Sequence, residues 1–144
     1  MLIKIKRLNK NAIVPTSGSE HSAGHDLYAC LEQSVQLLPQ HTVMIPTGWS
    51  MALPENTVGL IFARSGLATK QNLAPANKVG VVDSDYRGEY LIALHNHGHE
   101  VRTIHHGDRV AQLVVVPYIK GEFEEVNELD QTNRGDGGFG STGK

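Results

Sequence analysis

The apolar runs of this sequence are short, and each ends at Gly, Pro, Asn, Asp or another polar residue. Several runs contain adjacent valines or isoleucines, as expected for strands covered on both faces. No stretch of ten or more residues has a helical period, and one or two helical turns at most are expected around residues 67–73. The pattern predicts an all-β sandwich, jelly roll or barrel. The predicted strands are residues 2–8, 42–45, 58–62, 79–82, 90–94 and 110–116.

Size, charge and cysteine content limit the kinds of partner. The chain has 144 residues, enough for one domain with a real core. Its formal net charge is −2, so no basic surface for a nucleic-acid polymer or an anionic membrane is expected. The single cysteine, Cys30, excludes an internal disulfide and predicts a buried, unreactive thiol in a reducing cytosol. Residues 1–10 lack the apolar run of a signal peptide, and no stretch has transmembrane length, which predicts a soluble, cytoplasmic protein.

The last fourteen residues, QTNRGDGGFGSTGK, differ from the rest because five are glycine and only one is aromatic. They offer too little apolar surface to offset the entropy of ordering them. One interpretation is a frayed terminus or a cloning remnant. The other is a ligand clamp, with an arginine and hydroxyls for phosphate, a ring for a flat base, and glycines for close backbone approach. The predicted division is a β domain over residues 1–130 and a flexible arm over residues 131–144.

Two polar segments in the first half of the chain are candidates for a site. In AGHDLYA, Asp26 either closes an Asx-turn or helps to hold the water shell of a metal ion. In ARSGLA, directly after a predicted strand, Arg64, Ser65 and the backbone at Gly66 form a compact anion-binding set. The same Arg-Ser-Gly sequence is also common in ordinary turns.

Two further segments follow in the second half. In NKVGVVDSDYRGE, Asp83 comes directly after an apolar run, either in a tight turn or as a rigidly mounted carboxylate that takes a proton from water. In GDRVAQLVV, Asp108 and Arg109 are candidates for a structural salt bridge. Gln112 lies within an apolar strand, so its amide is expected either in a cross-strand core hydrogen bond or directed at a ligand.

In this order and spacing, these four segments and the glycine-rich tail resemble the five signature motifs of the trimeric dUTPase family. The resemblance extends over residues 23–143, and DSDYRGE and RGDGGFGSTG are its most specific elements. It implies a distorted jelly-roll or β-sandwich-like barrel with at most one short helix. It also implies a magnesium-dependent enzyme that hydrolyses dUTP to dUMP and pyrophosphate, limiting uracil incorporation into DNA and supplying dUMP for thymidylate synthesis.

The resemblance assigns a role to each motif. Asp83 is implied as the general base for water attacking the α-phosphate, and Gln112 as the group that places the water or that phosphate. Mg²⁺ is implied to bridge the triphosphate oxygens and to reach Asp26 through water. The phosphate-binding residues implied are Arg64, Ser65 and Gly66.

Nucleoside recognition is implied in the third motif and closure in the fifth. Asn77, the backbone at Gly80, Val81 and Val82, and Leu91 are implied to read the uracil edge, with Tyr86 under the deoxyribose. The family also implies a homotrimer whose sites take the third motif from a second chain and the tail from a third. The residues implied to close over the nucleotide are Arg134, Phe139, Gly140, Ser141 and Thr142.

Two departures and one cluster do not follow the family pattern. Ala63 stands where the second motif usually has proline, and Asp136 places an acid within the phosphate clamp. His95, His97 and His99 alternate, so on a strand they would share a face able to bind zinc or nickel. Gly98 indicates a turn instead, and His105 and His106 are expected in the loop before Gly107.

Two rival functions remain open. A dCTP deaminase, or a bifunctional deaminase-pyrophosphatase, shares the fold and resembles the third and fourth segments. Those enzymes use a glutamate base and an Arg-Ser-Ser type motif that this sequence lacks. An inactive relative that senses nucleotides would be expected to have lost Asp83, Arg64 or the tail, and all three are present.

Overall fold

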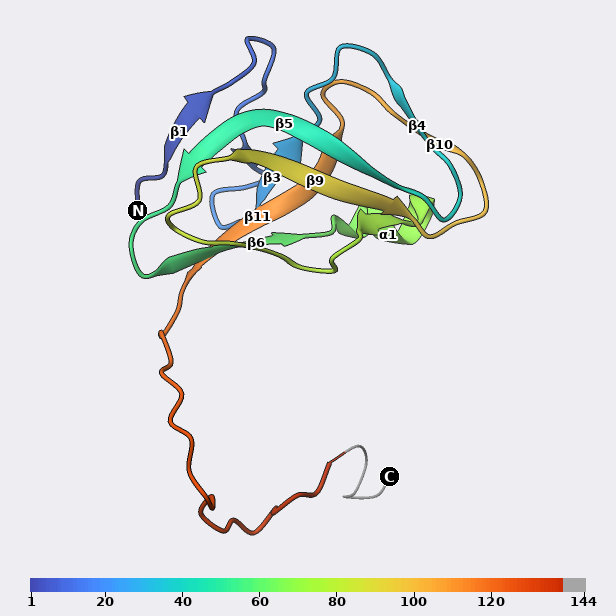
Figure 1. Ribbon diagram of the computed structural model, residues 1–144. Coiled ribbons are helices and arrows are strands. Elements are labelled where there is room, and N and C mark those ends of the chain that lie inside the picture. The colour runs from blue at the N-terminus through green and yellow to red at the C-terminus, as the bar shows by residue number, and fades with distance from the viewer. Residues whose placement is uncertain (139–144) are drawn as a thin grey trace.

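The chain forms three antiparallel β-sheets and one short helix, as seen in a computed structural model that describes residues 1–138 (Figure 1). The all-β, jelly-roll-like prediction with a single short helix is therefore confirmed. The elements are β1 (Lys4–Arg7), β2 (Thr16–Ser17), β3 (His25–Tyr28), β4 (Val35–Leu37), β5 (Thr42–Ala52), β6 (Thr57–Phe62), α1 (Ser65–Gln71), β7 (Leu73–Pro75), β8 (Gly80–Val82), β9 (Glu89–Asn96), β10 (Arg102–Ile104) and β11 (Arg109–Pro117).

Two larger sheets form the layers of the fold. One has the strand order β1-β5-β9-β7 and the other β2-β3-β11-β6-β8, while β10 and β4 pair separately. Figure 1 shows β5 and β9 stacked over β11 and β6, with the tail leaving the end of β11 and running away from the body. The buried residues between the layers come from both sheets, and they include Leu27, Ile61, Ile92 and Leu113. Burial of such apolar surface is the main force that holds the layers together.

The six predicted strands are all present, but β5 is much longer than predicted. Pro46 and Gly48 interrupt its sequence, and both residues normally disfavour a strand interior. The structure accommodates them with a register shift against β9 between Pro46 and Ser50. Gly48 takes φ +74°, and its backbone N–H donates to Glu89 Oε1 at 2.8 Å. The irregularity lets one strand continue to Ala52 and pair with β1 as well.

The predicted helical turns are confirmed as α1. The chain is extended at Arg64, and the helix ends where Asn72 takes the left-handed conformation with φ 58°. Asparagine tolerates that conformation better than most residues because its short polar side chain bonds locally. At its other end the helix begins directly after Arg64, so Ser65 and Gly66 lie on its first turn.

Within residues 1–138, no helix is long and apolar enough to cross a membrane. The single cysteine, Cys30, is buried as predicted, and burial raises the pKa of its thiol, with the nearby Glu89 carboxylate adding to the effect. A raised thiol pKa keeps the reactive thiolate scarce.

Candidate active site

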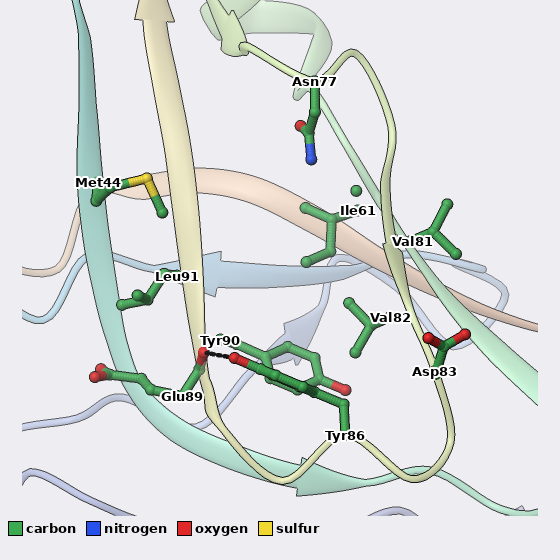
Figure 2. Close-up of a pocket in the computed structure, with 11 residues that line it drawn as sticks. Met44, Ile61, Asn77, Val81, Val82, Asp83, Tyr86, Glu89, Tyr90 and Leu91 are labelled. Atoms are coloured by element: carbon green, nitrogen blue, oxygen red, sulfur yellow. Dashed lines mark hydrogen bonds between the residues drawn. The ribbon is translucent and has the colours of Figure 1, made fainter.

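A cavity of about 280 Å³ opens between β8 and β9, and we call it the β8–β9 cavity. Figure 2 shows its lining residues, which come from β5, β6, β8, β9 and the two loops that flank β8. The structure thus brings together the predicted residues of the third motif with Leu91. The lining residues are Met44, Ile61, Asn77, Gly80, Val81, Val82, Asp83, Tyr86, Glu89, Tyr90 and Leu91.

The cavity has mostly apolar walls and one amide. In Figure 2 the Asn77 side chain points toward Ile61 from the loop before β8. The turn at Lys78, with φ 64°, fixes this loop, since Lys78 N donates to Pro75 O at 3.0 Å. A Cβ at Gly80 would lie 3.2 Å from the Ile61 side chain and 3.3 Å from Asn77 Nδ2. Glycine at this position therefore keeps open the space that the amide faces.

Asp83 lies at the rim of the cavity, directly after β8. Its carbonyl oxygen accepts a hydrogen bond from Tyr86 N at 3.1 Å, which closes a turn. Arg87 stabilises the same turn, because its Nη1 donates a hydrogen bond to Ser84 O at 2.7 Å. Ser50 Oγ in turn donates to Arg87 O at 2.7 Å. The turn that the sequence indicated is thus present, and it is also a rigid mount for the exposed Asp83 carboxylate.

The ring of Tyr86 lies along the chain at Gly88. Tyr86 Oη donates to Glu89 O at 3.1 Å. A Cβ at Gly88 would overlap the Tyr86 hydroxyl and ring, so only glycine leaves room for this arrangement. Tyr86 nevertheless remains 44% exposed, so one side of the ring is available to a ligand.

A second group of predicted residues gathers elsewhere, and we call Asp26, Arg64, Arg109 and Gln112 the arginine cluster. Asp26 does not close an Asx-turn, because it lies within β3 and pairs with Gln112 of β11. Arg64 Nε donates to Asp26 Oδ1 at 2.7 Å, and Arg109 Nη1 donates to Oδ2 at 3.2 Å. One carboxylate thus orients two guanidinium groups. The alternative of an Asp108–Arg109 salt bridge is wrong, since Asp108 Oδ2 instead accepts from His105 N at 2.8 Å.

Gln112 makes a hydrogen bond within the fold, as the first of its two interpretations predicted. Its Nε2 donates to Ala63 O at 2.9 Å, which holds the residue before Arg64. A Cβ at Gly24, the residue directly before β3, would lie only 2.6 Å from Gln112 Oε1, so glycine there leaves room for the amide. Gln112 therefore helps to place Arg64 even though the usual proline is replaced by Ala63.

Asp83 and the arginine cluster lie at opposite ends of β6, and the β8–β9 cavity extends from Asp83 along β6 to Ile61. Strands β6 and β8 are antiparallel, with Gly59 opposite Val82, so Asp83 lies near the start of β6. Arg64 follows the other end of β6, where Phe62 pairs with Gln112. Six residues of extended chain between these levels span about 20 Å. One chain therefore holds Asp83 and Arg64 well apart.

The remaining predicted groups join neither half. Arg134 lies on the tail, where its Nε donates to Gly137 O at 2.8 Å, and Asp136 is exposed beside it. The predicted residues Phe139, Gly140, Ser141 and Thr142 lie outside the described residues.

The three alternating histidines do not form a three-ligand metal site. The rings of His95 and His97 lie 4.4 Å apart, but β9 ends at Asn96 and the chain bends from Gly98 onward. Among residues 1–138, no group of three or more His, Cys, Asp or Glu side chains is placed to hold a metal ion. His105 and His106 occupy the loop before Gly107, as predicted.

Sequence reasoning missed four lining residues and one arginine. Met44, Ile61, Glu89 and Tyr90 lie in strands, where nothing distinguishes a residue that lines a cavity from one that fills the core. The sequence indicates Arg109 only as a partner for Asp108. Its distance of 83 residues from Asp26 in the sequence hides their contact.

A jelly-roll-like β fold with a mainly apolar cavity, a rim carboxylate and a separate guanidinium pair defines a class of protein. Apolar walls with a few placed polar groups are typical of small-molecule sites, and guanidinium groups are typical of phosphate recognition. The class is therefore that of β-fold proteins with a cavity for a small molecule and a separate candidate site for an anionic group.

Comparison with known proteins identifies the family. A family model described as dUTPase matches residues 10–143. The deoxyuridine 5′-triphosphate nucleotidohydrolase of Desulfitobacterium hafniense is 49% identical over 146 residues, covering 98% of this chain and 97% of that relative. The structure of the Staphylococcus bacteriophage 80alpha dUTPase with dUPNHPP has a TM-score of 0.90 at 30% identity, covering 99% of both chains. A mutant dUTPase from phage phi11 of S. aureus, whose structure reveals the coordination of a structural Mg(II) ion, has a TM-score of 0.78 at 27% identity and covers 89% of this chain and 98% of its own. The chain belongs to the dUTPase family.

Proposed function

We propose that this chain hydrolyses dUTP to dUMP and pyrophosphate, the activity for which its relatives are named. The observation that carries the proposal is the β8–β9 cavity, which has apolar walls, an amide on one side and a carboxylate at the rim. The reaction would limit uracil incorporation into DNA and supply dUMP. The single buried thiol of Cys30 supports a reducing compartment such as the cytoplasm.

The nucleoside occupies the β8–β9 cavity in this proposal. Asn77 and the backbone from Gly80 to Val82 and at Leu91 read the uracil edge, and a close fit around that edge would exclude a thymine methyl group. Hydrogen bonds to the substrate's own edge reject a cytosine ring, because an unpaired polar group in a closed site is costly. Tyr86 packs under the deoxyribose with its exposed face.

Asp83 is the general base in this proposal. Its carboxylate accepts a proton from a water molecule while the water oxygen forms a bond to the α-phosphorus. The bond from that phosphorus to the bridging oxygen breaks, and pyrophosphate leaves. An ordinary carboxylate is a weak base, so the pinned turn that holds Asp83 supplies much of the effect through positioning.

The arginine cluster and the start of α1 bind the phosphates. Arg64 is oriented by Asp26 and offers further guanidinium donors to an anion. Ser65 and Gly66 are exposed, and a Cβ at Gly66 would meet nothing within 4 Å. The fold itself therefore does not require glycine there, and close approach of a ligand to the backbone explains it. Gln112 acts by holding Ala63 and so the position of Arg64.

Magnesium fits this donor set through water. Each oxygen of Asp26 accepts one guanidinium hydrogen bond and retains a lone pair for a water ligand of the ion. Mg²⁺ keeps several waters and usually binds phosphate oxygens alongside only one or two carboxylates, so three protein ligands are not needed. The ion would neutralise charge on the leaving pyrophosphate.

The two halves meet between copies of the chain. About 20 Å of strand separates Asp83 from Arg64, whereas the phosphates of one nucleotide are contiguous. A homotrimer in which each site takes the β8–β9 cavity from one copy and the arginine cluster from another joins them. The arm, residues 131–144, would come from a third copy and close over the nucleotide with Arg134, Phe139, Ser141 and Thr142.

The test is pyrophosphate release from dUTP, with dCTP, dTTP and UTP in parallel, for the wild type and Asp83→Asn. Removing a general base lowers kcat by about 10²–10⁴-fold. Asp85→Asn is the matched control, because Asp85 is an exposed acid on the same turn that does not line the cavity. Ammonia release from dCTP would instead identify a deaminase, and tight binding of dUTP without hydrolysis would identify a nucleotide sensor.

A further inference from the structure

Two of the three alternating histidines lie together where β9 ends, beside α1 (Figure 1). Along β9, Ile92, Leu94 and Asn96 are buried, so His95 and His97 lie on the opposite face of the chain. The centres of their rings are 4.4 Å apart, and the ring planes are tilted by 59°. We call these two residues the histidine pair, and the reaction proposed above uses neither of them.

The spacing of the histidine pair suits two ligands of one metal ion. An imidazole nitrogen lies about 2.1 Å from a bound transition metal, so two imidazoles that meet the ion at about 90–100° have ring centres about 4.6–5.0 Å apart. The observed 4.4 Å differs from this range by a few tenths of an ångström. Rotation of a histidine ring about χ2 is soft enough to supply that difference.

A hydroxyl group on the neighbouring strand holds the ring of His95. Thr42 pairs with His95 across β5 and β9, and Thr42 Oγ1 lies 2.8 Å from His95 Nδ1. When Nδ1–H donates in this hydrogen bond, Nε2 keeps a free lone pair. Metal-bound histidines commonly donate their other ring N–H to a fixed acceptor in this way, which sets the tautomer and the orientation of the ring.

A network of polar groups fixes the backbone at His97, although this residue lies beyond the end of β9. His97 N donates to Asn72 O at 2.8 Å. Gln40 Nε2 donates to the carbonyl oxygens of His97 and Gly98, both at 3.2 Å. Asn96, which is fully buried, accepts a hydrogen bond from Gly98 N at 2.9 Å. A ligand residue on such a fixed backbone loses little freedom when it binds an ion.

The charge state of His97 also favours a ligand role. Partial burial lowers the pKa of His97, and His95 and Lys78 add to the effect. The ring is therefore neutral at neutral pH, and a neutral imidazole has the lone pair that a metal requires. Imidazole nitrogen suits zinc, nickel and copper, whereas Mg²⁺ prefers oxygen ligands.

We propose that the histidine pair is a binding site for a divalent transition-metal ion, with water in the remaining coordination positions. The site is separate from the residues that serve Mg²⁺ in the proposed reaction, and it does not depend on that reaction. Both protein ligands come from one chain, so a single copy is sufficient to bind the ion.

Calorimetric titration of the nucleotide-free protein with Ni²⁺, in the presence of excess Mg²⁺, tests the proposal. His95→Gln and His97→Gln should each weaken binding about 10²-fold, because the remaining imidazole then binds the ion without its partner. His99→Gln is the matched control and should change Kd less than about twofold, since His99 is exposed in the bend beyond the histidine pair. Circular dichroism checks that each variant is folded.

A second pair of variants tests the hydroxyl group that holds His95. Thr42→Val removes the acceptor and should weaken Ni²⁺ binding about tenfold, whereas Thr42→Ser keeps the hydroxyl and should bind within about twofold of the wild type. Equal Ni²⁺ affinity of the wild type and His97→Gln, or equal losses in His97→Gln and His99→Gln, would overturn the proposal. Because the titration needs no nucleotide, failure of the protein to hydrolyse dUTP would refute the proposed function alone.

Discussion

The separation of Asp83 from Arg64 predicts that two inactive variants regain activity when they assemble together. Asp83→Asn removes the base but keeps the arginine cluster, whereas Arg64→Gln keeps the base and removes a phosphate ligand. If each site combines the cavity of one copy with the cluster of another, a mixed trimer contains some sites with both groups intact. If each chain builds its own site, none can form.

The magnitude follows from the geometry of the shared site. In an equal mixture, the copy that supplies the cavity carries a wild-type Asp83 half of the time. The copy that supplies the cluster carries a wild-type Arg64 half of the time, independently. Random assembly of a closed cyclic trimer therefore predicts about one quarter of wild-type activity.

The assay is dUTP hydrolysis after the two variants are unfolded together, refolded and compared with each variant treated alone. Size-exclusion chromatography checks that all samples assemble alike, and the arms are wild type in both variants. Activity near one quarter of the wild-type value supports the shared site. Activity no higher than the sum of the separate variants would refute the inference that Asp83 and Arg64 of one site come from different copies of the chain.

Three other predictions concern stability. Asp26→Asn leaves two guanidinium groups without their counter-charge and should lower the unfolding free energy by about 1–3 kcal/mol. The loss is smaller than for a fully buried pair because the groups are partly exposed. Urea denaturation at fixed protein concentration measures the loss, and a value near zero would contradict the prediction. Gly24→Ala places a Cβ 2.6 Å from Gln112 Oε1 and should lower the unfolding free energy by about 1–3 kcal/mol. Gly121→Ala is the control and should change the unfolding free energy little, because its Cβ would meet nothing within 4 Å. Equal shifts of the melting temperature in the two variants would contradict the predicted clash. Burial raises the pKa of Tyr90 from an ordinary 10.0 to about 12, so the stability linked to its protonated hydroxyl is complete below pH 10 and is lost as the pH rises toward 12. Tyr90→Phe should therefore reduce the loss of unfolding free energy between pH 10 and pH 12. An unchanged dependence of the unfolding free energy on pH would contradict the raised pKa.

The six strands could be predicted from the sequence because the residues in each run favour a strand by both type and pattern. Runs such as residues 58–62 and 110–116 have few alternatives to a strand, and β6 and β11 are found there. The full length of β5 could not be predicted, because Pro46 and Gly48 oppose a strand and only pairing with β9 and β1 overrides them. The short β3 was missed for a similar reason, since its polar residues are held by β11.

The site was predictable where residues close in sequence lie close in space. Asp83 and Tyr86 are on one turn, and both reach the β8–β9 cavity as expected. The contact between Asp26 and Arg109 depends on the register of β3 against β11, which no local pattern contains. The position of Tyr90 in the cavity wall could not be predicted for a different reason, because an aromatic residue in an apolar strand normally belongs to the core.

In the proposed reaction, water activated by Asp83 attacks the α-phosphorus of dUTP. Hydrolysis of dUTP in ¹⁸O-labelled water, followed by mass spectrometry of the products, shows which phosphorus the water attacks. The label is expected in dUMP and not in pyrophosphate, with product formation strongly reduced in Asp83→Asn and retained in Asp85→Asn. Label in pyrophosphate, or products other than dUMP and pyrophosphate, would contradict it.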